Sequence, residues 1–148
     1  MRSIKNIELF NSNRSIKRSF NNNQFNLILT PRRWGLTSLL IDYVNEIQSD
    51  KSILFNVANS IMVRDVERRI TNRRCMVKTI SETSSIGYRY DYIICDNFFN
   101  QNWIKNMILL APTLNTDGKI ILADSGKYLG ENVIGHFRNY NKIIKTSL

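Results

Sequence analysis

The stretch that decides the fold is FNLILTPRRWGLTSLL, residues 25–40. It begins with the mostly apolar run at residues 25–30, which predicts a strand buried on both faces. Pro31 breaks this run, and two arginines follow it. Gly35 then precedes a segment whose apolar residues recur at helical spacing. A strand, a tight loop and a helix in this order is the context in which proteins hold phosphate at a helix N-terminus.

The loop in this stretch corresponds to a phosphate-binding P-loop with two key positions changed. The pattern is G-x-x-x-x-G-K-[ST], and its second glycine and hydroxyl are present as Gly35 and Thr37. Thr30 replaces the first glycine, and Leu36 replaces the lysine that reaches the phosphates. The residues that would contact a nucleotide are Thr30, Pro31, Arg32, Arg33, Trp34, Gly35, Leu36, Thr37 and Ser38. Taken alone, the segment could also be a plain strand-to-helix turn, because short motifs match by chance.

Strands and helices alternate along the rest of the chain. Apolar runs predict further strands at residues 52–57, 75–80, 90–96, 119–123 and 142–145. Helical spacing predicts helices at residues 12–20, 35–48, 60–70, 100–111 and 128–140. The polar residues 115–118 predict a turn before the fifth strand. This alternation is typical of a three-layer α/β sandwich with a mostly parallel sheet and right-handed crossovers.

The strand predicted at residues 90–96 ends on an acid, Asp96, and Asn97 follows it. Ligands of open α/β sheets bind beyond the carboxyl ends of the strands, so Asp96 meets the loop if the first and fourth strands are neighbours. Thr37 and Asp96 would then hold a magnesium ion. Asn97 stands where many hydrolytic relatives carry an acid, and an amide can orient water but cannot accept its proton. Asp96 could equally be an ordinary strand-end carboxylate or a helix cap.

The composition indicates one compact domain with anionic partners. The 148 residues are 43% apolar, which suits a single domain over residues 1–148 whose first 24 residues form a basic segment with a short helix. Lys and Arg number 21 against 12 Asp and Glu, a net charge of +9. This excess favours nucleic acid, although a cationic surface often serves solubility alone. The arginines that we expect to contact nucleic acid are Arg68, Arg69, Arg73 and Arg74.

The cysteines and the apolar runs bear on location. Cys75 and Cys95 lie within apolar runs, which predicts buried free thiols and an intracellular, reducing setting. One histidine and the lack of a Cys/His cluster argue against a structural zinc. No apolar run approaches the roughly 20 residues that cross a bilayer, and the first ten residues lack the apolar core of a secretory signal. We therefore expect no membrane partner.

Taken together, these residues resemble the ATPase domain of the large terminase subunit, the motor that packages DNA in tailed phages and herpesviruses. The family's loop often reads as two basic residues, one variable residue and G-K-[ST], and residues 31–37 (PRRWGLT) match it with the lysine replaced. Its acidic strand ends in Asp-Glu, and residues 92–97 (YIICDN) match it with the glutamate replaced. Residues 120–125 (IILADS) are a poor match to its Thr/Ser-rich coupling motif. The resemblance implies a RecA-type core, a viral origin, and a location in the host cytoplasm, the nucleus or the virion.

Both departures from the family pattern remove catalytic groups. Losing an electrostatic contact such as the lysine typically costs about 3–4 kcal/mol of transition-state stabilisation, and losing the acid costs roughly 10²–10⁴-fold in rate. We therefore expect a pseudo-ATPase that serves as a binding or assembly module. It would bind ATP and magnesium weakly or not at all, and contact nucleic acid or a viral or self-assembly protein partner. Two alternatives stay open: an active NTPase completed by a partner in trans, with Arg32 or Arg33 as the phosphate cation, and a basic nucleic-acid-binding protein without a nucleotide site.

Overall fold

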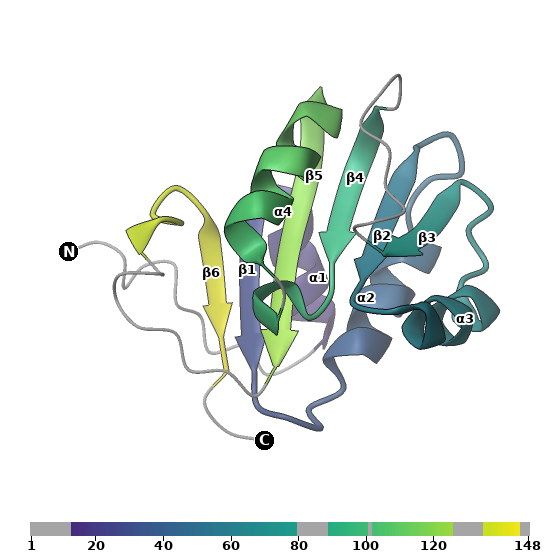
Figure 1. Ribbon diagram of the computed structural model, residues 1–148, viewed down its shortest axis with the longest axis horizontal. Helices are drawn as coiled ribbons and strands as arrows, with labels where there is room; N and C mark the ends of the chain where they lie inside the picture. Colours follow the sequence, from purple (N-terminus) through teal and green to yellow (C-terminus); the bar gives the residue numbers. More distant parts are fainter. Residues whose placement is uncertain (1–12, 80–88, 101, 126–134, 146–148) are drawn as a thin grey trace.

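The computed structural model describes residues 13–79, 89–100, 102–125 and 135–145. Within these ranges six strands form one sheet in the order β3-β2-β4-β5-β1-β6, and every ladder between neighbours is parallel (Figure 1). The strands are β1 Phe25–Thr30, β2 Ile53–Val57, β3 Cys75–Thr79, β4 Tyr90–Cys95, β5 Leu114–Ser125 and β6 Asn141–Ile144. The predicted parallel α/β architecture is therefore confirmed.

Helices cover both faces of the sheet. The α-helices are α1 Asn13–Asn22, α2 Leu36–Asn45, α3 Ser60–Arg69 and α4 Trp103–Leu110, and short 3-10 turns η3 Phe98–Asn100 and η4 Ala111–Thr113 flank α4. Figure 1 shows α4 in front of the sheet, with α1 and α2 behind it. One core cluster packs between the sheet and α1, α2 and α3, and a second packs between the sheet and α4. These layers form the predicted three-layer sandwich.

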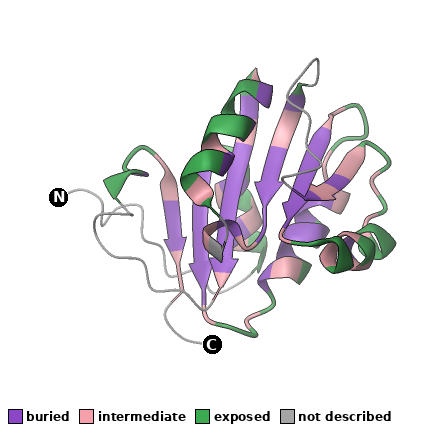
Figure 2. Ribbon diagram, viewed as in Figure 1, coloured by how far each residue is buried: buried purple, intermediate pink, exposed green. Residues whose placement is uncertain are grey.

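Burial on both faces explains why β1 reads as a continuous apolar run. It lies between β5 and β6, and Leu27 and Leu29 face the α4 side while Ile28 faces the α2 side. All three side chains are almost fully buried, and burying each contributes about 1.5–3 kcal/mol. Figure 2 shows the same pattern across the sheet, where buried residues line the strands and the outer surfaces of α3 and α4 are exposed. The loop after β1 therefore starts at the end of a buried, well-packed strand.

The first and fourth predicted strands are not neighbours, because β5 lies between β1 and β4. The register pairs Leu29 of β1 with Asp124 of β5, and Cys95 of β4 with Leu122 of β5. Since all three strands run parallel, their carboxyl ends still lie at one edge of the sheet. The predicted convergence of the strand ends thus holds across an intervening strand.

The turn predicted at residues 115–118 is wrong. β5 begins at Leu114 and continues to Ser125, with a register irregularity that pairs Leu114 with Tyr90 and Lys119 with Tyr92. The Asn115 amide Nδ2 donates to Asp91 Oδ1 at 2.8 Å, so the turn-prone residues bulge within the ladder instead of ending it.

The remaining predicted elements match except near the C-terminus. Of the helix predicted at residues 128–140, residues 128–134 lie outside the described ranges, and residues 136–140 form a turn that leads into β6. Both cysteines are free, Cys95 buried and Cys75 half-buried, and burial raises the pKa of the Cys75 thiol to about 12. No helix in the described ranges has the length and apolar character required to cross a membrane.

Candidate functional site

The loop between β1 and α2 is a tight turn, and two of its residues have positive φ. Arg33 has φ 62° and Gly35 has φ 95°, and the Trp34 N–H donates to the Pro31 carbonyl at 3.3 Å. A Cβ on Gly35 would meet nothing within 4 Å, so glycine is favoured there by its backbone conformation and not by lack of space. The Gly35 carbonyl then accepts from the Leu39 N–H at 3.0 Å, which begins α2. The sequence signal for strand, loop and helix thus corresponds to the actual backbone.

Leu36, at the position of the P-loop lysine, is a core residue. Its side chain is 4% exposed and belongs to the cluster between the sheet and the α1–α3 layer. Trp34 is half-buried and packs against the same cluster. An apolar side chain that packs into the core cannot supply a charge to a ligand held by the loop.

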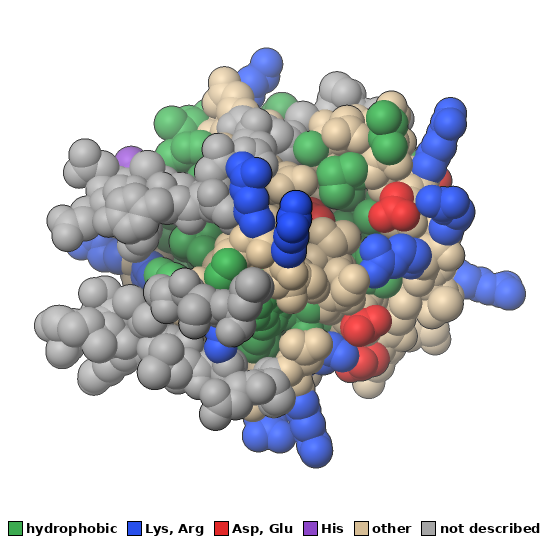
Figure 3. Space-filling model, turned by 90° about the horizontal axis from the view of Figure 1, so that it is seen from below, with side chains coloured by type: hydrophobic (Ala, Val, Ile, Leu, Met, Phe, Trp, Pro, Cys, Tyr) green, Lys and Arg blue, Asp and Glu red, His purple; other side chains and the backbone are tan. Residues whose placement is uncertain are grey.

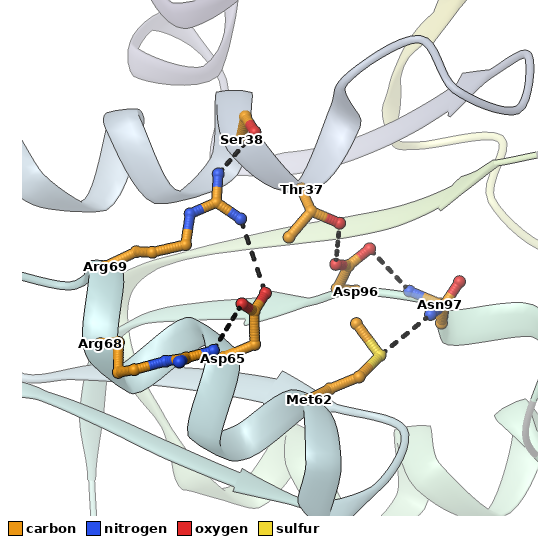
Figure 4. Close-up of polar contacts among 8 residues, drawn as sticks. All are labelled: Thr37, Ser38, Met62, Asp65, Arg68, Arg69, Asp96 and Asn97. Carbon is orange, nitrogen blue, oxygen red and sulfur yellow. Dashed lines mark hydrogen bonds and ion pairs between the residues drawn. The ribbon is translucent and has the colours of Figure 1, made fainter.

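Thr37 and Asp96 meet at the carboxyl edge of the sheet, as Figure 4 shows. The Thr37 hydroxyl Oγ1 donates to Asp96 Oδ2 at 2.6 Å, and the Asn97 N–H donates to Asp96 Oδ1 at 2.9 Å. Asp96 is 3% exposed. Burial raises the pKa of the Asp96 carboxyl above its usual range, the hydrogen bonds from Thr37 and Asn97 oppose this rise, and the neighbouring Asp124 adds to it.

Asp124, within the stretch IILADS of residues 120–125, is a second buried carboxylate at this edge. It is fully buried at the end of β5, where Oδ2 accepts from the Phe99 N–H at 2.6 Å and Oδ1 from the Ser125 N–H at 2.8 Å. Its bond to Phe99 fixes the turn η3 that follows Asp96. Its signal in the sequence is the same as for Asp96, an apolar strand that ends on an acid.

Asn97, at the place of the water-activating acid, adopts a left-handed conformation with φ 55°. Asparagine tolerates this region better than most residues. Its amide Nδ2 lies 3.5 Å from the sulfur of Met62 in α3, a weak contact drawn in Figure 4. The side chain therefore links the end of β4 to α3.

The arginine Arg69 links α3 to the first turn of α2. Its Nη2 donates to the Ser38 hydroxyl at 2.5 Å, and its Nη1 lies 3.6 Å from Asp65 Oδ2 (Figure 4). Arg68 shares the same carboxylate through a 3.3 Å contact with Asp65 Oδ1. Ser38 is thus occupied by a contact within the chain.

The four arginines predicted to contact nucleic acid do not form one group. Arg68 and Arg69 lie at the end of α3 and share Asp65. Arg73 and Arg74 are exposed and precede β3, where the Arg74 carbonyl accepts from the N–H of Ile53 at the start of β2. They therefore lie at the amino-end edge of the sheet, opposite the loop. Arg32 and Arg33 are exposed at the carboxyl-end edge.

The residues at this edge fit the metal of a magnesium–nucleotide better than its phosphates. Thr37 and Asp96 present oxygen atoms 2.6 Å apart, and magnesium prefers oxygen ligands. The residues that the structure describes contain no group of three or more His, Cys, Asp or Glu that could hold a metal without further ligands. At the phosphate side, Leu36 supplies no charge.

Comparisons with known proteins identify the fold. No protein-family model matches the sequence, and a search of curated proteins finds no match. Among solved structures, the UvsW helicase from bacteriophage T4 is similar with a TM-score of 0.67 and 9% identity, over 90% of this chain and 58% of that chain. A DEAD box protein from the hyperthermophile Methanococcus jannaschii is similar with a TM-score of 0.61 and 15% identity, over 88% of this chain and 48% of that chain.

The fold is a three-layer α/β sandwich with a P-loop NTPase-like core. A loop that joins a strand to a helix, as between β1 and α2, and an acid that follows a strand, as after β4, are features of such a core. This chain spans about half the length of the two similar structures. At these identities the likeness extends to the fold alone.

Proposed function

We propose that this chain is a catalytically degenerate P-loop domain, a pseudo-ATPase that acts as a binding or assembly module and contacts nucleic acid. The observation that supports it most directly is Leu36. A P-loop lysine compensates charge on the β- and γ-phosphates, and Leu36 is a buried hydrocarbon at that position. The loop joins a strand to a helix through Gly35, and the position of the P-loop cation holds a hydrocarbon.

The change at Asn97 supports the same conclusion. An attacking water needs a group that accepts its proton, and the Asn97 amide has no such capacity near neutral pH. Thr37 and Asp96 would hold a magnesium ion, which neutralises triphosphate charge when it is bound with a nucleotide. With neither the cation nor the base, bound nucleotide would stay intact, and we expect its binding to be weak or absent.

Viral DNA packaging is the biological context that we propose. Residues 31–37 and 92–97 resemble the two central motifs of terminase ATPases. The net charge of +9 suits a DNA-associated role, and a viral or self-assembly protein partner suits a domain that has kept its scaffold without its chemistry.

An ATPase assay tests the proposal. The purified chain is incubated with ATP and magnesium, with and without DNA, beside its Asp96→Ala variant. We expect no hydrolysis that depends on Asp96, and a calorimetric titration with magnesium–ATP should show weak binding or none. Turnover of about 1 s⁻¹ or faster, an ordinary rate for phosphoryl-transfer enzymes, that Asp96→Ala abolishes would overturn the proposal.

A working NTPase completed in trans is the second candidate, which the intact Thr37–Asp96 pair and the exposed Arg32 and Arg33 favour. It predicts tight magnesium–ATP binding that the double change Arg32→Ala, Arg33→Ala removes, and hydrolysis only in a complex. Nucleic-acid binding without any nucleotide binding would instead point to the third reading, a basic nucleic-acid-binding protein.

A further inference from the structure

Arg32 and Arg33 form the tip of the loop between β1 and α2. Both are exposed, and none of the ion pairs between residues in the described ranges includes either of them. Their charges are therefore available at the carboxyl-end edge of the sheet. Figure 3 looks onto this edge and shows cationic side chains standing out from the middle of the face.

The acids at the ends of β4 and β5 do not neutralise this tip. Asp96 and Asp124 are 3% and 0% exposed, and their oxygens accept hydrogen bonds from Thr37 and from backbone N–H groups. Buried and hydrogen-bonded carboxylates offer no surface group with which an exposed guanidinium can pair. A ligand arriving from solvent at the loop would thus meet positive charge first.

The backbone on which the two arginines stand is constrained. Trp34 packs against the core directly after them, and Arg33 itself has φ 62°. In the described ranges the only residues other than glycine with positive φ are Arg33 and Asn97, and both lie at this edge. A left-handed conformation costs an ordinary residue roughly 1–2 kcal/mol, and such strain persists mainly at binding and switch sites. The backbone therefore sets where the two side chains leave the loop, while their guanidinium groups stay in solvent.

We propose that Arg32 and Arg33 bind the phosphodiester backbone of nucleic acid, so that the loop contacts the phosphates of a polymer from outside and does not enclose those of a nucleotide. This inference rests on the proposed function and names its contact surface. Guanidinium groups bind phosphate oxygens in a bidentate manner, and backbone contacts of this kind carry no sequence preference. The sequence instead predicted nucleic-acid contacts at residues 68, 69, 73 and 74. In the structure Arg68 and Arg69 share the carboxylate of Asp65, and the other two arginines lie at the opposite edge of the sheet.

The structure offers a matched control for the test. Arg32→Ala with Arg33→Ala and Arg73→Ala with Arg74→Ala remove the same charge from exposed pairs at opposite edges of the sheet. Binding of a labelled oligothymidine strand and of a labelled duplex is measured by fluorescence anisotropy at about 50 mM and about 200 mM salt. We expect the loop variant to bind at least about tenfold more weakly, with a slope of log K against log salt reduced by roughly 1.4 for the single strand, about 0.7 for each lost contact.

The control variant should stay within about twofold of the unchanged chain and keep its salt slope, because its arginines face away from the proposed surface. A third variant, Arg32→Lys with Arg33→Lys, should retain most of the affinity, which separates loss of charge from damage to the loop. Equal losses in both alanine variants would show an effect of net charge only, and no loss in the loop variant would also overturn the inference. If the unchanged chain binds neither probe at low salt, the proposed nucleic-acid role fails with it; if it binds and the loop variant is unaffected, only this inference fails.

Discussion

Replacing Leu36 by Lys restores the residue that a P-loop would carry, and we expect it to destabilise the protein without restoring the site. Leu36 is 4% exposed in the core cluster, so truncation to Ala falls in the class of buried Leu→Ala changes that cost about 2–5 kcal/mol. Because Leu36 is the first residue of α2, the adjoining loop can relax, and we expect about 2–3 kcal/mol. Lys removes the same packing and must carry its ammonium back to solvent, so its cost should be similar.

Thermal and urea unfolding of Leu36→Lys and Leu36→Ala measure this cost. A loss of about 2–3 kcal/mol corresponds to a fall of roughly 4–12 °C in the unfolding temperature for a chain of this size. The exposed Leu109 of α4 supplies the control, since Leu109→Lys at a surface position should change stability by less than about 0.5 kcal/mol. A Leu36→Lys variant as stable as the unchanged chain that also binds magnesium–ATP at least about tenfold tighter would show that position 36 faces a phosphate cradle, and our reasoning would be wrong.

Three further predictions concern the same edge of the sheet. Thr37→Val removes the 2.6 Å hydrogen bond to a buried carboxylate and should cost about 1.5–3 kcal/mol in urea unfolding; an unchanged midpoint would contradict the contact. The pKa of the Asp96 carboxyl is raised in the folded chain, so ionising it destabilises the fold as the pH rises from 3.8, the pKa of the unfolded chain, through the folded-state pKa. The neutral Asp96→Asn variant lacks this effect, so its stability relative to the unchanged chain should increase from pH 4 to pH 8. A difference in stability that does not change with pH would refute this. Gly35→Ala should cost about 1–2 kcal/mol through its φ of 95° alone, because its Cβ meets nothing within 4 Å, and a neutral effect would mean that the loop relaxes freely.

Local signals in the sequence predict most of the fold. The run from Phe25 to Thr30 is apolar because β1 is buried on both faces, and Pro31 and Gly35 mark the ends of the loop for backbone reasons. The meeting of Thr37 and Asp96 also follows from sequence, because parallel strand ends share an edge.

The parts that the sequence did not predict depend on long-range pairing. No local signal indicates that β5 inserts between β1 and β4. The polar residues 115–118 are of types that favour turns. They stay in the strand because Leu114 pairs with Tyr90 in the ladder and the side chain of Asn115 donates a hydrogen bond to Asp91. Similarly, the bond between Arg69 and Ser38 joins residues 31 positions apart, so helical spacing alone assigned that arginine to solvent and to nucleic acid.

The way the loop is anchored bears on which of its positions can change without harm to the fold. β1 is held by neighbours on both sides, and α2 buries six of its ten residues, so both supports of the loop are secured by hydrocarbon packing. Folding therefore depends on the packing of these two supports and on the loop backbone, and it depends little on the exposed side chains of Arg32 and Arg33. Changes at the exposed positions 32 and 33 should therefore cost the fold little, so new surface contacts can evolve there on a well-packed support.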